Sequence, residues 1–349
     1  MKKLVSILLV SICALSLAGC GEKKLTRYKA TFLTLFDTVS LVSGFAPDAD
    51  SFDATAQRFH DELQVYHELF DIYNDYDGIA NIKTINDNAG VAPVKVDEKI
   101  LDMLSLAVEM YGRTDGKINV AMGSVLALWH DARVYGTDHP EEAKLPDDAA
   151  LQAAAQHTDI NDLVIDRAAG TVYIADPAMR LDVGAIGKGY AVEKVCETME
   201  SEGVSAYVLS VGGNVRTIGG RDDGSDWTVG IENPWSQDET DAYLLTVGAR
   251  DLSVVTSGSY QRYYTVDGVR YHHIIDPETL YPSDKYVSVT VLARDSALAD
   301  ALSTALFNMD YAAGSALIES LDGVEAMWVY TEKDRSYSSG FKSYVLSEN

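Results

Sequence analysis

The chain has 349 residues, 47% of them hydrophobic, and carries 53 acidic against 28 basic side chains, a net charge of −25. This composition excludes extensive disorder and argues against binding to nucleic acid. The length is sufficient for one large or two modest hydrophobic cores.

The first thirty residues have the layout of an export signal followed by a lipid attachment site. Lys2 and Lys3 precede an apolar run, residues 4–17, that is shorter than the ~20 residues a membrane-spanning helix needs. The run closes on Leu17-Ala18-Gly19-Cys20, which resembles the cleavage box of bacterial lipoproteins. We therefore expect a signal peptide at 1–19, an anchor and tether at 20–30 with lipid on Cys20, and a folded domain at 31–349.

The three cysteines exclude a disulfide framework. Cys13 lies in the predicted signal and Cys20 is the predicted lipid site, so that Cys196 alone remains in the folded part. Because the acidic surface is repelled by anionic headgroups, attachment to the extracytoplasmic face of the cell membrane must come from the acyl chains.

Hydrophobic periodicity predicts the elements of the first half. Residues 28–45 are rich in Thr, Val, Leu and Phe and indicate one or two strands, and Asp48 can then cap an amphipathic helix that continues to Phe70. The stretch 74–93 is rich in turn residues, and Asp97 opens a second helix that Gly112 is expected to end.

Strands outnumber helices in the remaining chain. We expect a hairpin at 163–174, a helix at 187–202, strands at 207–211, 227–231, 243–247 and 286–293, a hairpin turning at Asp267-Gly268, and a helix at 296–309. Residues 136–148 are the only linker-like segment. The hairpins imply antiparallel pairs, so we expect an α+β fold with mixed, largely antiparallel sheets and packed helices.

A glycine-rich segment, residues 181–190, opens the predicted helix at 187. Its three glycines allow the backbone to come close to a phosphate. The spacing fits neither the P-loop nor the dinucleotide G-x-G-x-x-G motif, so on its own the segment favours a plain helix-start loop.

Two further patterns carry polar groups. The adjacent strand residues His272 and His273 face opposite ways and cannot easily share a metal ion, so one of them is the better candidate for contact with a ligand. On the helix 296–309, Asp300 and Thr304 lie one turn apart, opposite an apolar stripe that starts at Leu298. Their oxygens suit Mg²⁺, although a solvated polar face is the simpler explanation.

The order of the motifs along the chain is more specific than any one of them. The segments are Phe36-Asp37-Thr38, Thr114-Asp115-Gly116, Leu181 to Tyr190, Val211-Gly212-Gly213-Asn214, Thr256-Ser257-Gly258-x-Tyr260-x-Arg262, His272 to Pro277, Ser288-Val289-Thr290-Val291 and Ala299 to Leu306. This order resembles the signature of the ApbE-type FAD:protein FMN transferases over residues 31–330. The chain departs from the family pattern at Asp37 and Leu280, where the family often has Gly, at Gly187, where it often has Ala, and at Ile118-Asn119, where it often has Phe-Asp.

The resemblance implies an ApbE-like fold and a set of site residues. The backbone carbonyl of Ala185 would join Asp300 and Thr304 around Mg²⁺. The FAD site would be formed by Asp182, Lys188, Ile274 and the segment Lys117-Ile118-Asn119, with Phe36 and Tyr73 near the flavin.

The resemblance also implies the reaction. An acceptor Thr or Ser oxygen would attack the FMN-side phosphorus of FAD and AMP would leave, while Mg²⁺ and Lys188 neutralise charge. His273 is the first candidate for the general base and Asp300 the second. Expected partners are FAD and membrane or exported redox proteins. An FAD pyrophosphatase and a flavin-binding lipoprotein remain alternatives.

Overall fold

The computed structural model describes residues 25–33 and 35–348, so the predicted signal peptide and Cys20 lie outside the described residues. Within these ranges, no helix is both long enough and apolar enough to cross a membrane.

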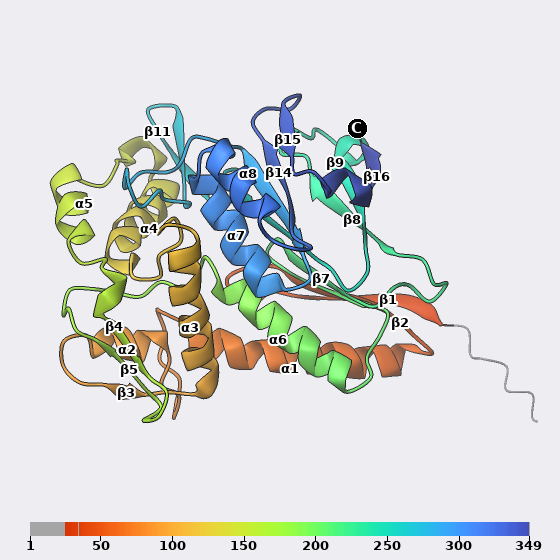
Figure 1. Cartoon of the computed structure of the whole chain (residues 1–349), viewed down its shortest axis with the longest axis horizontal. Coiled ribbons are helices and arrows are strands. Elements are labelled where there is room, and N and C mark those ends of the chain that lie inside the picture. Colours follow the sequence, from red (N-terminus) through yellow and green to blue (C-terminus); the bar gives the residue numbers. More distant parts are fainter. Residues whose placement is uncertain (1–24, 34, 349) are drawn as a thin grey trace, which may run out of the picture.

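An eight-stranded sheet forms the centre of the described part of the molecule (Figure 1). Its strands follow the order β1-β2-β6-β7-β10-β13-β14-β15, and each neighbouring pair is antiparallel. The bounds are β1 Thr26–Phe32, β2 Ser40–Ala46, β6 Tyr207–Val211, β7 Asn214–Ile218, β10 Ser253–Gly258, β13 Ser288–Ala293, β14 Glu325–Val329 and β15 Arg335–Tyr337. The expected α+β fold with largely antiparallel sheets is confirmed.

Helices cover one face of this sheet and a second sheet covers the other. The helices are α1 (Ala49–Phe70), α6 (Gly187–Ser201), α7 (Ser296–Asn308) and α8 (Tyr311–Glu319), and the covering sheet is β16-β9-β8 (Val345–Glu348, Tyr243–Ala249 and Trp227–Glu232). Because strand side chains alternate, Ala326 and Trp328 of β14 enter the core under the helices, whereas Met327 and Val329 enter the core under the covering sheet. Both faces of the central sheet are therefore buried at β13 and β14, whereas the edge strand β1 stays partly exposed.

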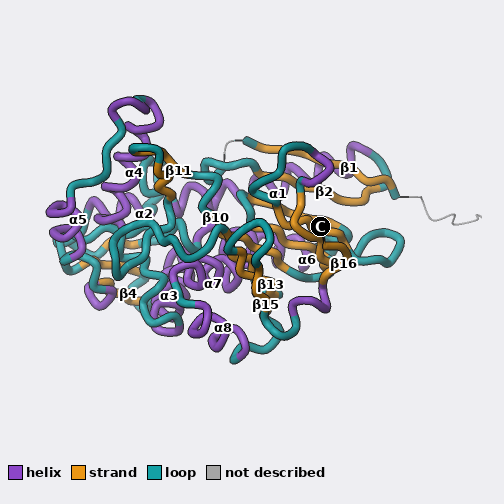
Figure 2. The backbone as a smooth tube through the Cα atoms, turned by 90° about the horizontal axis from the view of Figure 1, so that it is seen from above, coloured by secondary structure: helices purple, strands orange, loops and turns teal. Residues whose placement is uncertain are grey.

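A third hydrophobic cluster is formed by elements that lie at the end of the molecule opposite β1 and β16 (Figure 2). It joins α4 (Gly123–Asp138) and α5 (Asp148–Ala155) to the hairpin of β11 (Tyr263–Val266) and β12 (Val269–His272). The remaining elements are α2 (Ile82–Asp87), α3 (Glu98–Arg113) and the sheet β3-β5-β4 (Val94–Lys95, Thr171–Ile174 and Leu163–Asp166), with single 3₁₀ turns at Pro140–Glu142, Ile160–Asp162, Glu239–Asp241 and Phe341–Tyr344.

Aspartate caps set the starts of the main helices. Asp48 accepts from the backbone N–H of Ser51 at the start of α1, and Asp97 accepts from Lys99 at the start of α3. Asp295 accepts from both Ala297 and Leu298 at the start of α7. Side-chain oxygens satisfy backbone donors that have no partner within the helix, which is why the first two starts could be read from the sequence.

The structure differs from the expected elements in several places. Gly112 does not end α3, which continues to Arg113 before the chain turns at Gly116 in a left-handed conformation (φ 76°). The segment 136–148 is not a linker, since α4 and a 3₁₀ turn occupy its first part, and the turn-rich stretch 74–93 contains α2. Residues 26–30, assigned to the tether, belong to β1, which pairs with β2 along its whole length.

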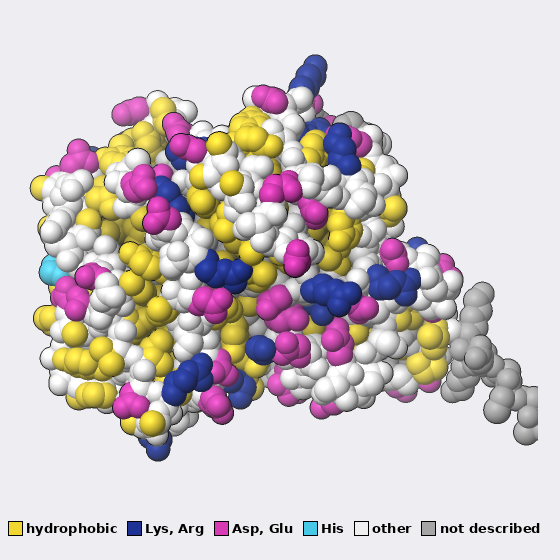
Figure 3. Space-filling view, in the orientation of Figure 1, with side chains coloured by type: hydrophobic (Ala, Val, Ile, Leu, Met, Phe, Trp, Pro, Cys, Tyr) yellow, Lys and Arg dark blue, Asp and Glu magenta, His cyan; other side chains and the backbone are white. Residues whose placement is uncertain are grey.

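The surface carries charges of both signs. On the face shown in Figure 3, basic side chains lie among more numerous acidic ones, and no extended basic area is visible on this face.

Candidate active site

Most of the segments singled out in the sequence meet around one cavity of about 900 Å³, although Thr114-Asp115-Gly116 and Ser288-Val289-Thr290-Val291 do not line it. Its walls come from the loop between β1 and β2, the loop after α1, the start of α6, one face of α7, the end of β10, the β6–β7 turn, α4 and the β11–β12 region. The predicted site residues that line it are Phe36, Tyr73, Lys117, Asn119, Asp182, Ala185, Lys188, His273, Ile274, Asp300 and Thr304. Ile118 does not line it, because its side chain is buried in the core under the helices.

Asp300 is held at the contact between α6 and α7. Its Oδ2 atom accepts a hydrogen bond of 2.7 Å from the backbone N–H of Gly189 and lies 3.9 Å from Lys188 Nζ. Burial raises the pKa of Asp300, and the Lys188 ammonium and the Gly189 N–H oppose this shift. The simpler explanation of a solvated polar face is therefore wrong, since α7 is packed on nearly all sides and only Leu298 and Thr304 of its residues are not fully buried.

The oxygen atoms beside Asp300 are of the kind that Mg²⁺ prefers. Thr304 Oγ1 lies 3.3 Å from Ser257 Oγ, and both hydroxyls face the cavity. Asn214 also lines it, and its buried Oδ1 atom has no hydrogen-bond partner among the described residues. A carboxylate, a hydroxyl and an orphaned amide oxygen form a hard donor set that fits Mg²⁺.

Acidic and imidazole ligands alone do not build a metal site here. Within residues 25–33 and 35–348, no group of three or more His, Cys, Asp or Glu side chains could hold an ion. An ion beside Asp300 would take its other ligands from hydroxyl, carbonyl, water or substrate oxygens, which is the usual pattern for Mg²⁺.

The two adjacent histidines have different environments. His272 is buried; its Nδ1 accepts from the backbone N–H of Ile274 at 3.2 Å, so its Nε2 donates to Ser283 O at 2.8 Å. His273 lines the cavity, where water still reaches its ring. Desolvation by the cavity walls, followed by the charges of Arg262, Lys188 and Arg133, lowers the pKa of His273 to about 3. His273 is therefore neutral in the free protein at neutral pH.

Two arginines in the cavity wall are absent from the predicted site. Arg262 donates to the backbone oxygen of Asp37 at 2.8 Å, and Arg133 approaches His130 Nδ1 at 3.2 Å. The sequence offered a signal for Arg262, which stands in one of the quoted motifs. It offered none for Arg133, because α4 itself was not predicted.

The loop that carries Phe36 is fixed from several sides. Phe36 and Asp37 both have left-handed backbone, with φ of 55° and 49°. The N–H of Phe36 donates to His67 Nδ1 at 3.3 Å. A Cβ atom added at Gly212, itself at φ 51°, would lie 2.6 Å from Thr38 Oγ1, so glycine is needed where the loop meets the β6–β7 turn.

Tyr73 stands at the cavity mouth. Its side chain is half-exposed and its ring lies 5.2 Å from that of His130, measured between centroids. A partly exposed aromatic ring over an open cavity can stack on a planar ligand.

Three further predicted residues that line the cavity, Lys117, Asn119 and Asp182, are held by polar contacts. Lys117 Nζ lies 2.8 Å from Glu278 Oε1 and 3.3 Å from Asp276 Oδ1. Asn119 donates to Thr158 O and accepts from the N–H of Ala121. Asp182 Oδ1 accepts from the N–H of Gly184 at 2.8 Å, and burial raises the pKa of Asp182.

An enzyme cavity lined by cations, hard oxygens and aromatic rings suits a phosphate-bearing aromatic ligand. The sequence also identifies the protein family to which this α+β fold belongs. The profile of the ApbE family matches residues 26–328. The chain belongs to this family.

Relatives of known sequence and of known structure support this family assignment. The FAD:protein FMN transferase of Treponema pallidum (strain Nichols) is 31% identical over 98% of this chain and 94% of its own length. The protein of the same name from Klebsiella pneumoniae (strain 342) is 31% identical over 82% of this chain and 85% of its own. The crystal structure of the ApbE protein of Thermotoga maritima superposes with a TM-score of 0.80 at 26% identity, covering 92% of this chain and 100% of that one.

Proposed function

We propose that this protein transfers FMN from FAD to a Thr or Ser hydroxyl of an acceptor protein and releases AMP. The observation that carries the proposal is the convergence of Lys188, His273, Asp300 and Thr304 on one cavity in a chain of the ApbE family. The reaction forms a bond between the acceptor oxygen and the FMN-side phosphorus, breaks the bond from that phosphorus to the bridging oxygen, and leaves AMP with the bridging oxygen.

The residues of the cavity divide the work. Lys188 places positive charge beside the pyrophosphate, where negative charge increases on the departing AMP oxygen. His273 accepts the hydroxyl proton, because it is neutral in the free protein and lines the same cavity. The positive charges around His273 are offset when the anionic FAD binds, and this raises its basicity at the stage at which a base is needed.

Asp300, Thr304 and the backbone carbonyl of Ala185 would hold Mg²⁺, and Asn214 supplies a further oxygen nearby. When bound, the ion neutralises charge on the pyrophosphate. Phe36 and Tyr73 would contact the flavin ring, while Asp182, Lys117, Asn119 and Ile274 would bind the rest of FAD.

The protein acts at the extracytoplasmic face of the membrane in this proposal. The Leu17-Ala18-Gly19-Cys20 sequence supports lipid attachment at Cys20, which would hold the enzyme near membrane or exported redox proteins.

The test is incubation of the purified protein with FAD, Mg²⁺ and a candidate redox protein, followed by in-gel flavin fluorescence and measurement of AMP. We expect covalent fluorescence on the acceptor and one AMP per flavin transferred, and neither with Asp300→Asn. AMP released at full rate without acceptor would identify a pyrophosphatase instead. FAD binding without AMP release under any condition would identify a flavin-binding protein.

A further inference from the structure

Helices α6 and α7 are joined by two hydrogen bonds that mirror each other. Asp300 of α7 accepts from the backbone N–H of Gly189 in the first turn of α6, at 2.7 Å. Glu193 of α6 accepts from the backbone N–H of Ser296 in the first turn of α7, at 2.6 Å. Each helix therefore gives one carboxylate to the other, and on both helices the two positions are one turn apart.

The backbones approach very closely between these two bonds. A Cβ atom added at Gly189 would lie 2.3 Å from Asp300 Cβ and 2.3 Å from the Ser296 carbonyl oxygen. Asp300 therefore cannot reach the Gly189 N–H unless the start of α7 stays where Glu193 holds it.

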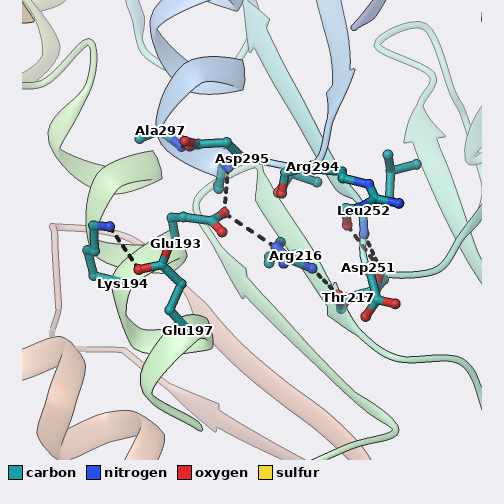
Figure 4. Close-up of polar contacts among 12 residues, drawn as sticks. Glu193, Lys194, Glu197, Arg216, Thr217, Asp251, Leu252, Arg294, Asp295 and Ala297 are labelled. Atoms are coloured by element: carbon teal, nitrogen blue, oxygen red, sulfur yellow. Dashed lines mark hydrogen bonds and ion pairs between the residues drawn. The ribbon is translucent and has the colours of Figure 1, made fainter. Parts of the chain in front are cut away.

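Glu193 is itself fixed from the central sheet. Its Oε2 atom lies 3.3 Å from Nε of Arg216, which projects from β7, and both side chains are almost completely buried. Figure 4 shows Glu193 turned towards Arg216 on one side and towards the start of α7 at Asp295 on the other. Arg216 also reaches Glu200, a more exposed residue about two turns further along α6. A buried carboxylate that has both a cationic and a backbone partner has a fixed position.

We propose that Glu193 is a positioning residue for Asp300: with Arg216 it fixes the first turn of α7 and so sets the place of the carboxylate that would bind Mg²⁺. This inference rests on the proposed metal role of Asp300. Glu193 itself does not line the cavity, so it acts only through α7.

The test compares Glu193→Ala and Glu193→Gln with Glu200→Ala, a matched control that removes the other carboxylate partner of Arg216 and leaves the Glu193–Ser296 hydrogen bond unchanged. Two Mg²⁺ titrations are measured. The first gives the Mg²⁺ concentration at half-maximal AMP formation. The second follows the melting temperature in the presence of ADP and gives the Mg²⁺ concentration at half of its total rise. We expect Glu193→Ala to raise both concentrations about tenfold or more, the usual effect of losing a partner that orients a metal ligand. Glu193→Gln keeps an acceptor for the Ser296 N–H and should stay within about threefold of wild type, like Glu200→Ala.

A fourth variant separates positioning from stability. In Glu193→Met/Arg216→Met the buried ion pair is replaced by apolar side chains, which often restores stability. This double variant has no carboxylate at position 193 to accept from the Ser296 N–H. Its Mg²⁺ requirement should therefore be as high as that of Glu193→Ala, although its melting temperature is near that of the wild type. A wild-type Mg²⁺ requirement in this double variant, or in a folded Glu193→Ala protein, would overturn the inference. If the wild-type protein itself shows no Mg²⁺ dependence, the failure is that of the proposed metal site.

Discussion

Gly189→Ala is the smallest change that should disturb the site. Its added Cβ would lie 2.3 Å from both Asp300 Cβ and the Ser296 carbonyl oxygen, whereas ordinary contact begins at 3.4 Å. Neither atom belongs to the flexible end of a side chain, so α6 and α7 must separate by roughly 1 Å, a misplacement that can reduce the rate about 100-fold. We also expect a loss of about 1–3 kcal/mol in the free energy of unfolding, as for other overpacked sites.

The assay is the initial rate of AMP formation with FAD and acceptor, together with urea unfolding. Gly112→Ala is the control, because Gly112 also lies inside a helix but its added Cβ meets nothing within 4 Å. That variant should gain about 0.5–1 kcal/mol of stability at unchanged activity. If Gly189→Ala behaves like Gly112→Ala, the close contact between α6 and α7 is not needed and our account of Asp300 fails.

Three further changes test other parts of the site and the anchor. Lys188→Ala should raise the apparent KM for FAD by an amount equivalent to about 1.5–3 kcal/mol with little change in melting temperature, and an unchanged KM would remove Lys188 from the FAD site. Because the pKa of His273 is lowered in the folded protein, its contribution to stability is fully present above its ordinary pKa of 6.5 and is lost as the pH falls towards about 3. The melting temperature of His273→Gln should therefore fall less than that of the wild type between pH 6.5 and about 3, and its rate at neutral pH should be about 10²–10⁴-fold lower. Identical pH profiles of stability in the two proteins would contradict this assignment. Cys20→Ala should leave uncleaved precursor or release soluble protein, as judged by membrane sedimentation and intact mass, and wild-type protein without lipid would refute the anchor.

The elements that could be predicted are those with local signals. Asp48 and Asp97 cap helices as expected, and the turn at Asp267-Gly268 joins β11 to β12, because a capping carboxylate or a left-handed turn is determined by a few neighbouring residues. Helix α4 has no such signal. Its N-cap, Met122, makes no side-chain cap, and its first residue is glycine because a Cβ there would lie 2.6 Å from the Arg180 carbonyl oxygen. A tertiary contact decides that start, so the sequence pattern could not.

The same distinction holds in the site. The order of the motifs led to Lys188, His273, Asp300 and Thr304, all of which line the cavity. The burial of Asp300 was not predicted, since the amphipathic pattern of α7 conceals that α6, β10 and β13 surround the helix. Arg133 was missed for a related reason, as its place depends on how α4 packs across the chain.

Two of the four departures from the family pattern, at Asp37 and Leu280, have a physical explanation in the backbone. Asp37 and Leu280, which stand where the family often has Gly, have φ of 49° and 62°, the left-handed region in which glycine carries no steric cost. Aspartate tolerates this region comparatively well, whereas leucine costs roughly 1–2 kcal/mol there. Leu280 offsets that cost by burial in the third cluster, and its carbonyl accepts a 2.8 Å bond from Trp129 Nε1. At both positions the required backbone is kept with a different side chain, so neither departure argues against the assignment of the site.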